Sequence, residues 1–275
     1  MKPALSQVCS LNSPFEKDIA DYAAGQCEAI EVWFTKLETY LETNSLDDAR
    51  GLLAEHHVTL PVASFQGGLF TSQGDARREA WSLFQRRLEL CRDLEIKTIV
   101  VACDLFGPLN DQDIERAYVS LDQAAQLAAE HGKRIALEFQ SRAALGNNLL
   151  TAAGLVARVN HPSLGLCLDA FHFYVGPSQT EDLACLTKEN LFHVQLSDLA
   201  DTPRELATDA DRILPGDGDI PLEAIVARLA EIQYNGFVSV ELLNPRLWQV
   251  SSRQFGEIGM TALRGVLGQA SMEAP

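Results

Sequence analysis

Short apolar runs alternate with longer amphipathic stretches along the whole chain of 275 residues. Apolar runs bounded by Gly, Pro or Asn are typical of buried strands, and apolar residues spaced three and four apart are typical of helices that pack on one face. The pattern predicts strands at residues 5–9, 29–34, 58–65, 98–102, 134–139, 164–169, 191–196 and 236–242. It predicts helices at residues 14–24, 75–95, 111–132, 149–159, 180–190, 221–232 and 251–267, and a further helical piece that begins after Ser45.

The regular alternation of strand and helix predicts one fold class. Eight units in which a strand precedes a helix imply a parallel sheet, and closing that sheet gives a (β/α)8 TIM barrel of the α/β class. Such a barrel typically needs about 250 residues, so we expect a single domain over residues 1–275. An open doubly wound sheet is the alternative. It is less favoured because residues 10–14 lack the glycine fingerprint that such sheets often use to bind nucleotides.

The last four predicted strands each end in a polar residue that can bind a metal. Side chains alternate across a strand, so the large aliphatic residues of each run mark the face toward the helices and the others face the barrel axis. By this rule the inward residues near the carboxyl ends are Glu138, Asp169, Gln195 and Glu241. Barrel enzymes carry their active sites at that end of the strands, so these side chains form a candidate site.

The charge of this set predicts a bound cation. A single inward carboxylate is typical of a salt-bridged residue at the barrel rim, but three that converge on one axis would repel one another without a cation. Three carboxylates and one amide carbonyl are all oxygen ligands, which favours Mn²⁺ or Mg²⁺, with Co²⁺ as a working substitute. Zinc is less favoured because the set requires no imidazole or thiolate.

Other polar and aromatic residues are expected near the same end of the barrel. Glu31 and Trp33 share the inward parity of the second strand, and they and Gln66 are candidates either for substrate contact or for structural roles. His193 also has inward parity but lies one layer deeper, which indicates a residue behind the ligands. Trp248, beyond the last strand, is expected to cover the site or to lie in a subunit interface. The sequence is compatible with a homodimer or a homotetramer.

Composition excludes several function classes. The formal net charge of −16 opposes contact with polyanions, so neither nucleic acid nor a membrane surface is expected as a partner. No apolar run approaches the roughly 18 to 20 residues that span a bilayer, and the first residues do not resemble a signal peptide, which predicts a cytoplasmic protein. Six cysteines without a C-x-x-C pair predict buried free thiols rather than a disulfide framework.

Four sequence motifs resemble those of a known family. They are Ile135-Ala-Leu-Glu138-Phe, Leu168-Asp169-Ala-Phe-His172-Phe, Asp211-Arg212-Ile-Leu-Pro-Gly-Asp-Gly218 and Val238-Ser-Val-Glu241-Leu. Together they resemble the xylose isomerase-like TIM barrel superfamily of sugar isomerases and epimerases, and most closely its inosose isomerase branch. The resemblance extends over essentially the whole chain and is weaker in the N-terminal third.

The resemblance implies roles for individual residues. The family holds its metal through residues that match Glu138, Asp169, Gln195 and Glu241. Most members have histidine at the position of Gln195, and a glutamine there is similar to bacterial 3-dehydroshikimate dehydratases, which share the barrel and the three carboxylates. His172, expected in a loop at the mouth of the site, and Arg212 match residues that bind substrate. The alternatives are a structural histidine and a surface ion pair.

The residues and the resemblance together predict proton transfer next to a carbonyl group. We expect a divalent-metal-dependent isomerase or epimerase of a sugar or keto-cyclitol, acting on a small polyhydroxy ketone or aldehyde. The metal would stabilise an enediolate while Glu138 and Glu241 remove and return the proton on opposite faces. If a hydroxyl group leaves from the β carbon, the same intermediate makes the protein a dehydratase of the 3-dehydroshikimate or keto-inositol type, with His172 as the candidate acid.

Two further function classes are weaker alternatives. A repair nuclease of the endonuclease IV type needs a histidine-rich zinc cluster and a basic face, whereas the chain has six histidines and a net charge of −16. A barrel that binds a sugar without catalysis is the other class. The sequence does not predict which substrate is used or whether it is phosphorylated.

Overall fold

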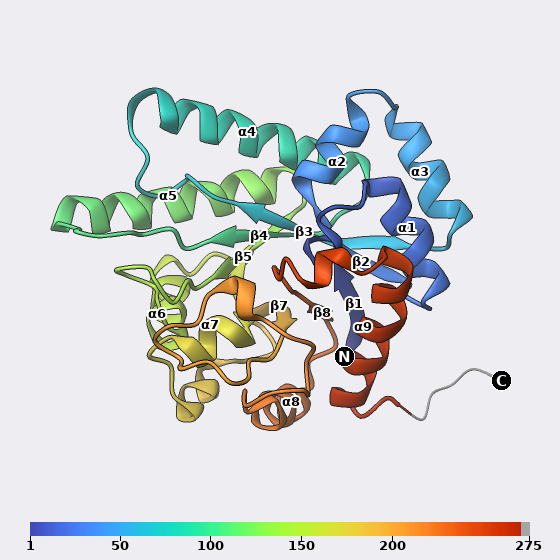
Figure 1. The fold of residues 1–275 in the computed structure, drawn as a ribbon. Helices are drawn as coiled ribbons and strands as arrows, with labels where there is room; N and C mark the ends of the chain where they lie inside the picture. Colours follow the sequence, from blue (N-terminus) through green and yellow to red (C-terminus); the bar gives the residue numbers. More distant parts are fainter. Residues whose placement is uncertain (271–275) are drawn as a thin grey trace. The chain divides into compact units, whose positions relative to one another are not determined.

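The computed structural model describes residues 1–270, and its strands form a closed parallel barrel in the order β1 to β8 (Figure 1). The strands are β1 (Lys2–Ser6), β2 (Ala29–Trp33), β3 (Thr59–Gln66), β4 (Thr98–Ala102), β5 (Arg134–Glu138), β6 (Leu164–Asp169), β7 (Leu191–Leu196) and β8 (Phe237–Val240). The helices are α1 (Phe15–Ala24), α2 (Phe34–Leu41), α3 (Leu46–Glu55), α4 (Gly74–Asp93), α5 (Asp111–Glu130), α6 (Leu149–Val159), α7 (Ala170–Val175), α8 (Leu222–Glu231) and α9 (Ser252–Val266). Short 3-10 turns are η1 (Gln7–Ser10), η2 (Thr180–Cys185), η3 (Asp209–Asp211) and η4 (Leu247–Gln249). The predicted (β/α)8 barrel is confirmed, and the open doubly wound sheet is wrong.

Two predicted elements are wrong. The first strand ends at Ser6 rather than at residue 9, because the next four residues form the buried turn η1, whose apolar side chains resemble a continuation of the strand. The helix expected at residues 180–190 is only the turn η2. The sequence pattern also misses α2 and α7. Each of these short helices begins directly at the end of a strand, so the apolar run of the strand continues into its first turn.

Contacts between residues divide the chain into two compact units. We call residues 1–61 and the described chain from Val194 onward the terminal unit, and residues 62–193 the central unit. The expectation of a single domain over residues 1–275 stays a prediction, and residues 271–275 lie outside the described residues.

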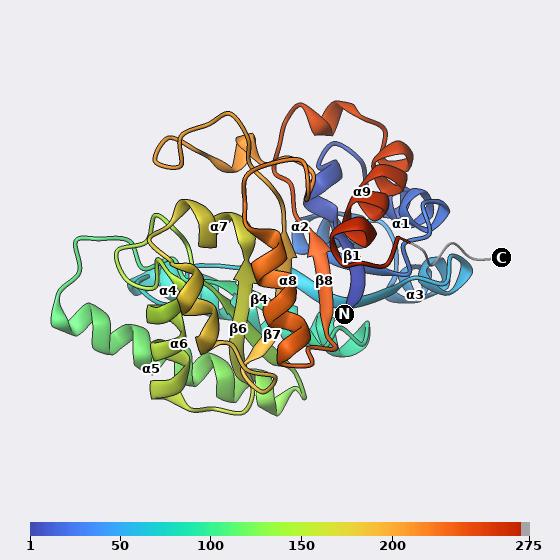
Figure 2. The same ribbon diagram turned by 90° about the horizontal axis from the view of Figure 1, so that it is seen from below.

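In the terminal unit the strands pair in the order β7, β8, β1 and β2. Helices α1 and α9, drawn in blue and red, lie side by side, and α9 also packs against β1 (Figure 2). The two helices approach closely at Gly25, because a Cβ atom added there would lie 2.6 Å from the backbone carbon of Gly256. A residue without a side chain is therefore required at this contact.

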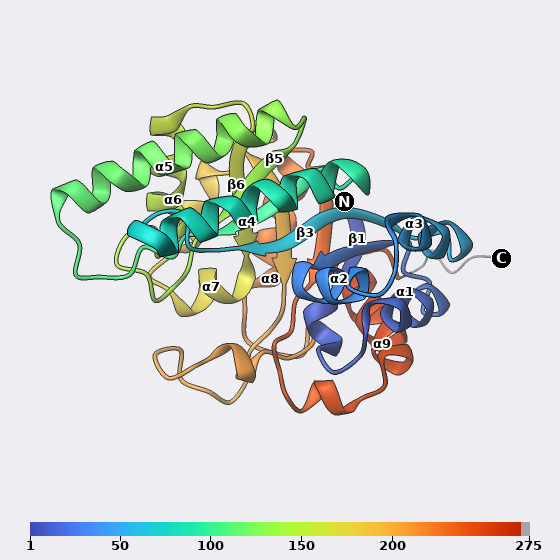
Figure 3. The same ribbon diagram turned by 90° about the horizontal axis from the view of Figure 1, so that it is seen from above.

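In the central unit the strands β3, β4, β5 and β6 pair in parallel in that order. The long helices α4 and α5 run lengthwise beside each other, and α5 and α6 pack on β5 and β6 (Figure 3). Buried side chains of this unit form one apolar layer, which consists of Val62, Val100, Ala136, Cys167 and Phe192. A Cβ atom on Gly165 would lie 2.6 Å from the ring of Phe192, so this glycine leaves room for the ring.

The strand register supports the predicted facing of the site residues. Paired residues on neighbouring parallel strands point to the same side of a sheet. Glu138 pairs with Cys167, which belongs to the buried apolar layer. In the terminal unit Gln195 pairs with Ser239, and both side chains bind the carboxylate of Glu31. In each unit these residues share the face that the alternation rule assigns to them.

The cysteines agree with the expectation of buried thiols rather than a disulfide framework. All six cysteines lie within the described residues, where none of them forms a disulfide, and five of them are buried. Burial raises the pKa of Cys27, Cys91 and Cys103 to about 12, so these thiols stay protonated near neutral pH. None of the helices within residues 1–270 is both long and apolar enough to cross a membrane.

Gly25→Ala is expected to lower the free energy of unfolding by about 1 to 3 kcal/mol, because the added methyl group overpacks the contact between α1 and α9. Gly51→Ala is the matched control, since a Cβ atom added at this position of α3 meets no atom within 4 Å. Alanine there is expected to raise the free energy of unfolding by about 0.5 to 1 kcal/mol through its helix propensity. Urea unfolding followed by circular dichroism measures both. Equal stabilisation in the two variants would contradict the close approach of the helices.

Candidate active site

Two carboxylates and an imidazole meet in the central unit. Glu138 is the last residue of β5, Asp169 is the last residue of β6, and His172 lies in the first turn of α7. The Nε2 atom of His172 lies 3.8 Å from Oε1 of Glu138 and 3.9 Å from Oδ2 of Asp169. All three side chains are buried. Water therefore screens their mutual interactions poorly.

A helix cap brings Asp169 and His172 together. Asp169 is the N-cap of α7, and its Oδ1 atom accepts hydrogen bonds from the backbone N–H groups of Phe171 at 2.7 Å and His172 at 3.4 Å. The cap uses one carboxylate oxygen, and the other faces the imidazole. The expectation that His172 lies in a loop is wrong, because this cap starts a helix directly at the end of the strand.

The composition of this cluster fits a metal site. One ligand atom from each of the three residues lies within 4.8 Å of the other two. A divalent ion about 2.0 to 2.3 Å from each ligand would hold such atoms roughly 3 to 4.5 Å apart, so a small closure of the side chains is enough. Ser141 steadies the imidazole of His172, since its Oγ lies 3.2 Å from Nδ1. The imidazole adds a nitrogen ligand to the oxygen ligands that the sequence predicts.

A second polar cluster, in the terminal unit, is organised around Gln195. Its Nε2 atom donates to Oε1 of Glu31 and to Oε1 of Glu241, each at 2.9 Å. Ser239 donates from its hydroxyl group to the other oxygen of Glu31. Gln195, Glu31 and Ser239 are completely buried, and Glu241 is 6% exposed. One side-chain amide thus joins two carboxylates that are largely removed from water.

Arg212 completes this second cluster. Its guanidinium donates from Nη1 to Oε2 of Glu241 at 3.2 Å, and from Nε and Nη2 to Oδ1 of Asp209 at 3.0 and 2.8 Å. The side chain of Asn244 donates to the backbone oxygen of Arg212 at 2.8 Å. Only 1% of Arg212 is exposed, so the alternative of a surface ion pair is wrong. The guanidinium instead supplies the carboxylate of Glu241 with a buried cation.

The loop that carries Arg212 is held by Asp198, a residue that the sequence analysis misses. Its buried carboxylate accepts hydrogen bonds of 2.9 to 3.0 Å from three backbone N–H groups of the loop. The donors are Leu199, Gly216 and Ile220. An aspartate two residues after a strand, followed by a loop rich in Asp, Gly and Pro, is the sequence signal that identifies such a role.

Of three other predicted residues, two bind protein groups and one is buried. Gln66 donates to a neighbouring backbone oxygen at 2.7 Å and accepts from Arg87 at 3.2 Å. His193 is completely buried, as expected for a residue behind the ligands. The indole of Trp248 donates to the backbone oxygen of Val8 at 2.8 Å. The expected contacts of Gln66 with substrate, and of Trp248 with the site or another subunit, stay predictions.

Residues 19–258 match the family model described as xylose isomerase-like TIM barrel. The chain belongs to this family. An inosose isomerase of Bacillus velezensis is 30% identical over 261 residues, and the alignment covers 92% of each chain. A 3-dehydroshikimate dehydratase of Pseudomonas aeruginosa is 28% identical over 266 residues, and that alignment covers 92% of this chain and 40% of the dehydratase.

Solved structures of other proteins contain the same barrel. The crystal structure of the IOLI protein with a bound zinc atom has a TM-score of 0.92 and 26% sequence identity, and the match covers 99% of this chain and 100% of that chain. A D-psicose 3-epimerase from Clostridium cellulolyticum H10, solved with D-tagatose, has a TM-score of 0.78 and 20% identity, with 97% and 99% coverage. At this lower identity, the epimerase supports the fold alone.

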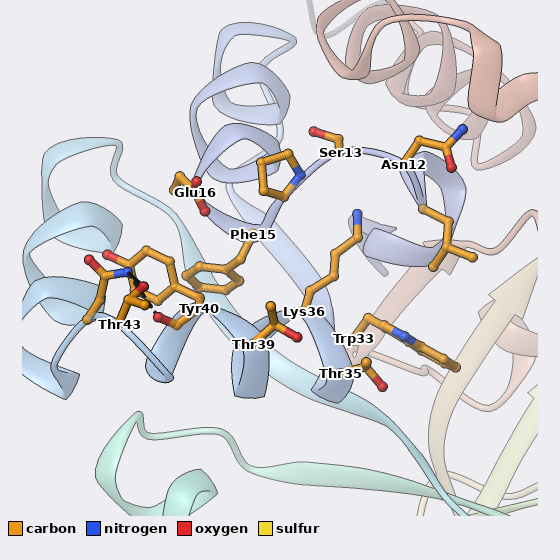
Figure 4. A pocket seen from close by; sticks show the side chains of 13 residues that line it. Asn12, Ser13, Phe15, Glu16, Trp33, Thr35, Lys36, Thr39, Tyr40 and Thr43 are labelled. Atoms are coloured by element: carbon orange, nitrogen blue, oxygen red, sulfur yellow. Dashed lines mark hydrogen bonds between the residues drawn. The ribbon is translucent and has the colours of Figure 1, made fainter.

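Trp33 lines a pocket of about 770 Å³ in the terminal unit (Figure 4). Residues 11–16 form one wall of the pocket, and α2 with the residues that follow it forms the other. The rings of Phe15 and Tyr40 lie close together in Figure 4, with their centroids 5.0 Å apart, and the amine of Lys36 points toward the first wall. The expected contact of Trp33 with substrate stays a prediction.

Lys36 forms a buried ion pair beside this pocket. Its Nζ atom donates to Oδ2 of Asp18 at 2.5 Å and to the backbone oxygen of Ser10 at 2.7 Å. Burial raises the pKa of Asp18 to about 6, although Lys36 acts in the opposite direction, and burial lowers the pKa of Lys36. The attraction between the two groups therefore offsets part of the cost of burying both charges.

Lys36→Met is expected to lower the free energy of unfolding by about 3 to 5 kcal/mol at pH 8, because Asp18 loses its buried cation. Without the ammonium group, the pKa of Asp18 in the folded protein rises further above its value in the unfolded chain. A raised folded pKa contributes stability that is complete below the unfolded pKa and is lost as pH rises through the folded pKa. The loss in Lys36→Met is therefore expected to be smaller at pH 5 than at pH 8.

Denaturant unfolding at the two pH values measures this difference. The double variant Asp18→Asn/Lys36→Met has no carboxyl group at this place, so Asp18 contributes nothing to its change in stability between pH 5 and pH 8. It is the baseline, and the stability of Lys36→Met is expected to fall more steeply than that of the double variant between the two pH values. A Lys36→Met protein that is equally destabilised at both pH values would contradict the assignment of the buried charge to Asp18.

Proposed function

We propose that the chain is a divalent-metal-dependent isomerase or epimerase of a sugar or keto-cyclitol. The observation that carries the proposal is the buried cluster of Glu138, Asp169 and His172, whose composition fits a metal ion. The inosose isomerase relatives support the same class of reaction. The substrate would be a small polyhydroxy ketone or aldehyde, and an inosose is the first candidate.

For the metal we propose the ligands Glu138, Asp169, Gln195 and Glu241, with Mn²⁺ or Mg²⁺ as the first candidates. The family resemblance supports this set, and the four residues lie at or next to the carboxyl ends of β5 to β8. The zinc atom of the IOLI structure and the imidazole of His172 make zinc a further candidate. When bound, the ion would supply a Lewis acid that stabilises negative charge on a substrate oxygen.

Glu138 and Glu241 act as the acid/base pair in the proposed reaction. One carboxylate removes the proton from the carbon next to the carbonyl group, and the other carboxylic acid returns a proton. Return to the opposite face of the same carbon is an epimerisation. Return to the neighbouring carbon, together with transfer of the proton of the adjacent hydroxyl group to the former carbonyl oxygen, is an isomerisation. Each of the two side chains is 6% exposed, which limits the exchange of the carried proton with bulk water.

His172 and Arg212 each lie next to one of these carboxylates. With its Nε2 atom 3.8 Å from Glu138, His172 is suited to pass a proton between that carboxylate and a substrate oxygen. The guanidinium of Arg212 orients Glu241 through one oxygen. It also adds a buried positive charge, which stabilises negative charge that develops on the substrate.

The second candidate is a metal-dependent dehydratase of the 3-dehydroshikimate or keto-inositol type. Gln195 favours it, because a glutamine in place of the usual histidine is similar to such dehydratases. The Pseudomonas aeruginosa dehydratase gives further support at 28% identity, although the chain spans only 40% of the length of that protein. The first proton abstraction would be the same, and His172 would then protonate the leaving hydroxyl group.

The two candidates are separated by incubating the Mn²⁺-loaded protein with an inosose and with 3-dehydroshikimate in deuterated water. We expect deuterium to enter an isomerised or epimerised product without loss of water. Loss of water and a new conjugated absorbance would contradict the isomerase and support the dehydratase. Glu138→Gln is expected to reduce turnover by about 100-fold or more while the ligand still binds in calorimetry. An active Glu138→Gln protein would remove Glu138 from the reaction.

Asp169→Asn is expected to weaken the binding of Mn²⁺ about tenfold or more, because it removes the charge of one proposed ligand. The asparagine retains the oxygen that caps α7, so the fold is preserved. Calorimetric titration of metal-stripped protein measures the affinity. Asp111→Asn, which removes an exposed carboxylate from the start of α5, is the control and is expected to bind like the unchanged protein. An unchanged affinity in Asp169→Asn would exclude this residue as a ligand.

A further inference from the structure

Glu31 is a buried carboxylate to which the proposed reaction assigns neither metal binding nor proton transfer. It lies on β2 and is completely removed from solvent. Its Oε1 atom accepts a hydrogen bond from Gln195, and its Oε2 atom accepts one from Ser239. Burial of a carboxylate is unfavourable unless its oxygens are engaged. The partners that engage both oxygens of Glu31 therefore indicate what this residue does.

The amide of Gln195 has two N–H bonds, and both are directed to carboxylates. The same Nε2 atom donates to Glu31 and to Glu241 at 2.9 Å. Two acceptors determine the plane of the amide group, and they require the nitrogen rather than the carbonyl oxygen on their side, because a carbonyl oxygen would be repelled by both. The carbonyl oxygen of Gln195 is consequently turned away from the two carboxylates.

We propose that Glu31 is a positioning residue that acts through Gln195. Its carboxylate, held by Ser239 of β8, fixes the amide so that the amide nitrogen holds Glu241 and the carbonyl oxygen of Gln195 would be the atom that binds the metal. The orientation of the Gln195 amide follows from its hydrogen bonds to Glu31 and Glu241 and does not depend on the proposed function. Its consequence for the metal rests on the proposed function.

A histidine at position 195 cannot replace this arrangement. Each ring nitrogen carries at most one proton, and a ring nitrogen that ligates a metal carries none. Such a histidine would have a single N–H group and would leave either Glu31 or Glu241 without its donor. Glu31 and Gln195 therefore form one functional pair. A second carboxylate beside residue 195 requires a side chain with two N–H bonds, which a glutamine ligand has and a histidine ligand lacks.

Metal titrations of Glu31→Gln, Gln195→His and the double variant test this pairing. Glu31→Gln is expected to weaken the binding of Mn²⁺ by about 10- to 100-fold. The double variant is expected to bind no more weakly than Gln195→His, since Glu31 then has no amide to position. If Glu31 acted only through its negative charge, the losses of affinity in the two single variants would multiply in the double variant. A loss in the double variant within about threefold of that product would overturn the proposal. Glu28→Gln, which alters an exposed carboxylate, is the control and is expected to retain the full affinity.

A second measurement does not depend on the metal or on the reaction. In metal-free protein labelled with ¹⁵N, the side-chain amide signals of Gln195, identified by their loss in Gln195→His, are expected to exchange slowly with water. Glu31→Gln is expected to accelerate this exchange about tenfold or more because one acceptor loses its charge. Unchanged exchange would overturn the proposal even if the protein turned over no substrate. Accelerated exchange in a protein that binds no Mn²⁺ would support the positioning role and contradict the proposed function.

Discussion

Carboxylates buried at the carboxyl ends of strands impose the main constraint on this structure. Asp169 is fully buried, and Glu138 and Glu241 are each 6% exposed. Such groups require donors or cations at close range. In the central unit, α7 begins at Asp169 and supplies backbone N–H groups and an imidazole. In the terminal unit, a side-chain amide and the guanidinium of Arg212 serve the same purpose. Hydrogen-bond donors and positive charge close to the strand ends thus stabilise the buried carboxylates.

Arg212 illustrates how far this arrangement extends from the barrel itself. Its charge reaches Glu241 only because the loop after β7 is folded back, and the carboxylate of Asp198 holds that loop through three backbone N–H groups. Asn244 adds a hydrogen bond to the backbone of Arg212. An aspartate that never touches a substrate in the proposed reaction therefore determines where the buried cation lies.

The sequence predicts most of the fold, because strands in a parallel barrel are buried on both faces and separated by long amphipathic helices. Its errors occur where two apolar elements join without a polar residue between them. The turn η1 continues the run of β1, and α7 follows β6 without a break. The pattern of apolar residues therefore does not mark where β1 ends and η1 begins, or where β6 ends and α7 begins. The boundary at Asp169 is made by a side chain that caps a helix, which is visible only when the backbone direction is known.

The sequence predicts those features of the candidate site that depend on the alternation of side chains between the two faces of a strand. Parity along a strand identifies Glu138 and Gln195, because each strand end has only two faces. The partners of these side chains are not predictable in the same way. That Gln195 binds Glu31 depends on the register between strands far apart in sequence, and that Arg212 is buried depends on the path of a loop. One-dimensional periodicity contains neither kind of information.

The surroundings of the two proposed acid/base residues are unequal, and this inequality bears on the choice between the two candidate reactions. Glu241 is held at one oxygen by Gln195 and at the other by Arg212, so its carboxylate is fixed in place. Glu138 lies beside His172, whose imidazole can donate or accept a proton. In the proposed isomerisation or epimerisation both carboxylates exchange protons with carbon, whereas a dehydration needs one such group and an acid for the leaving oxygen. The deciding property is therefore whether His172 delivers its proton to a leaving hydroxyl group or only assists Glu138.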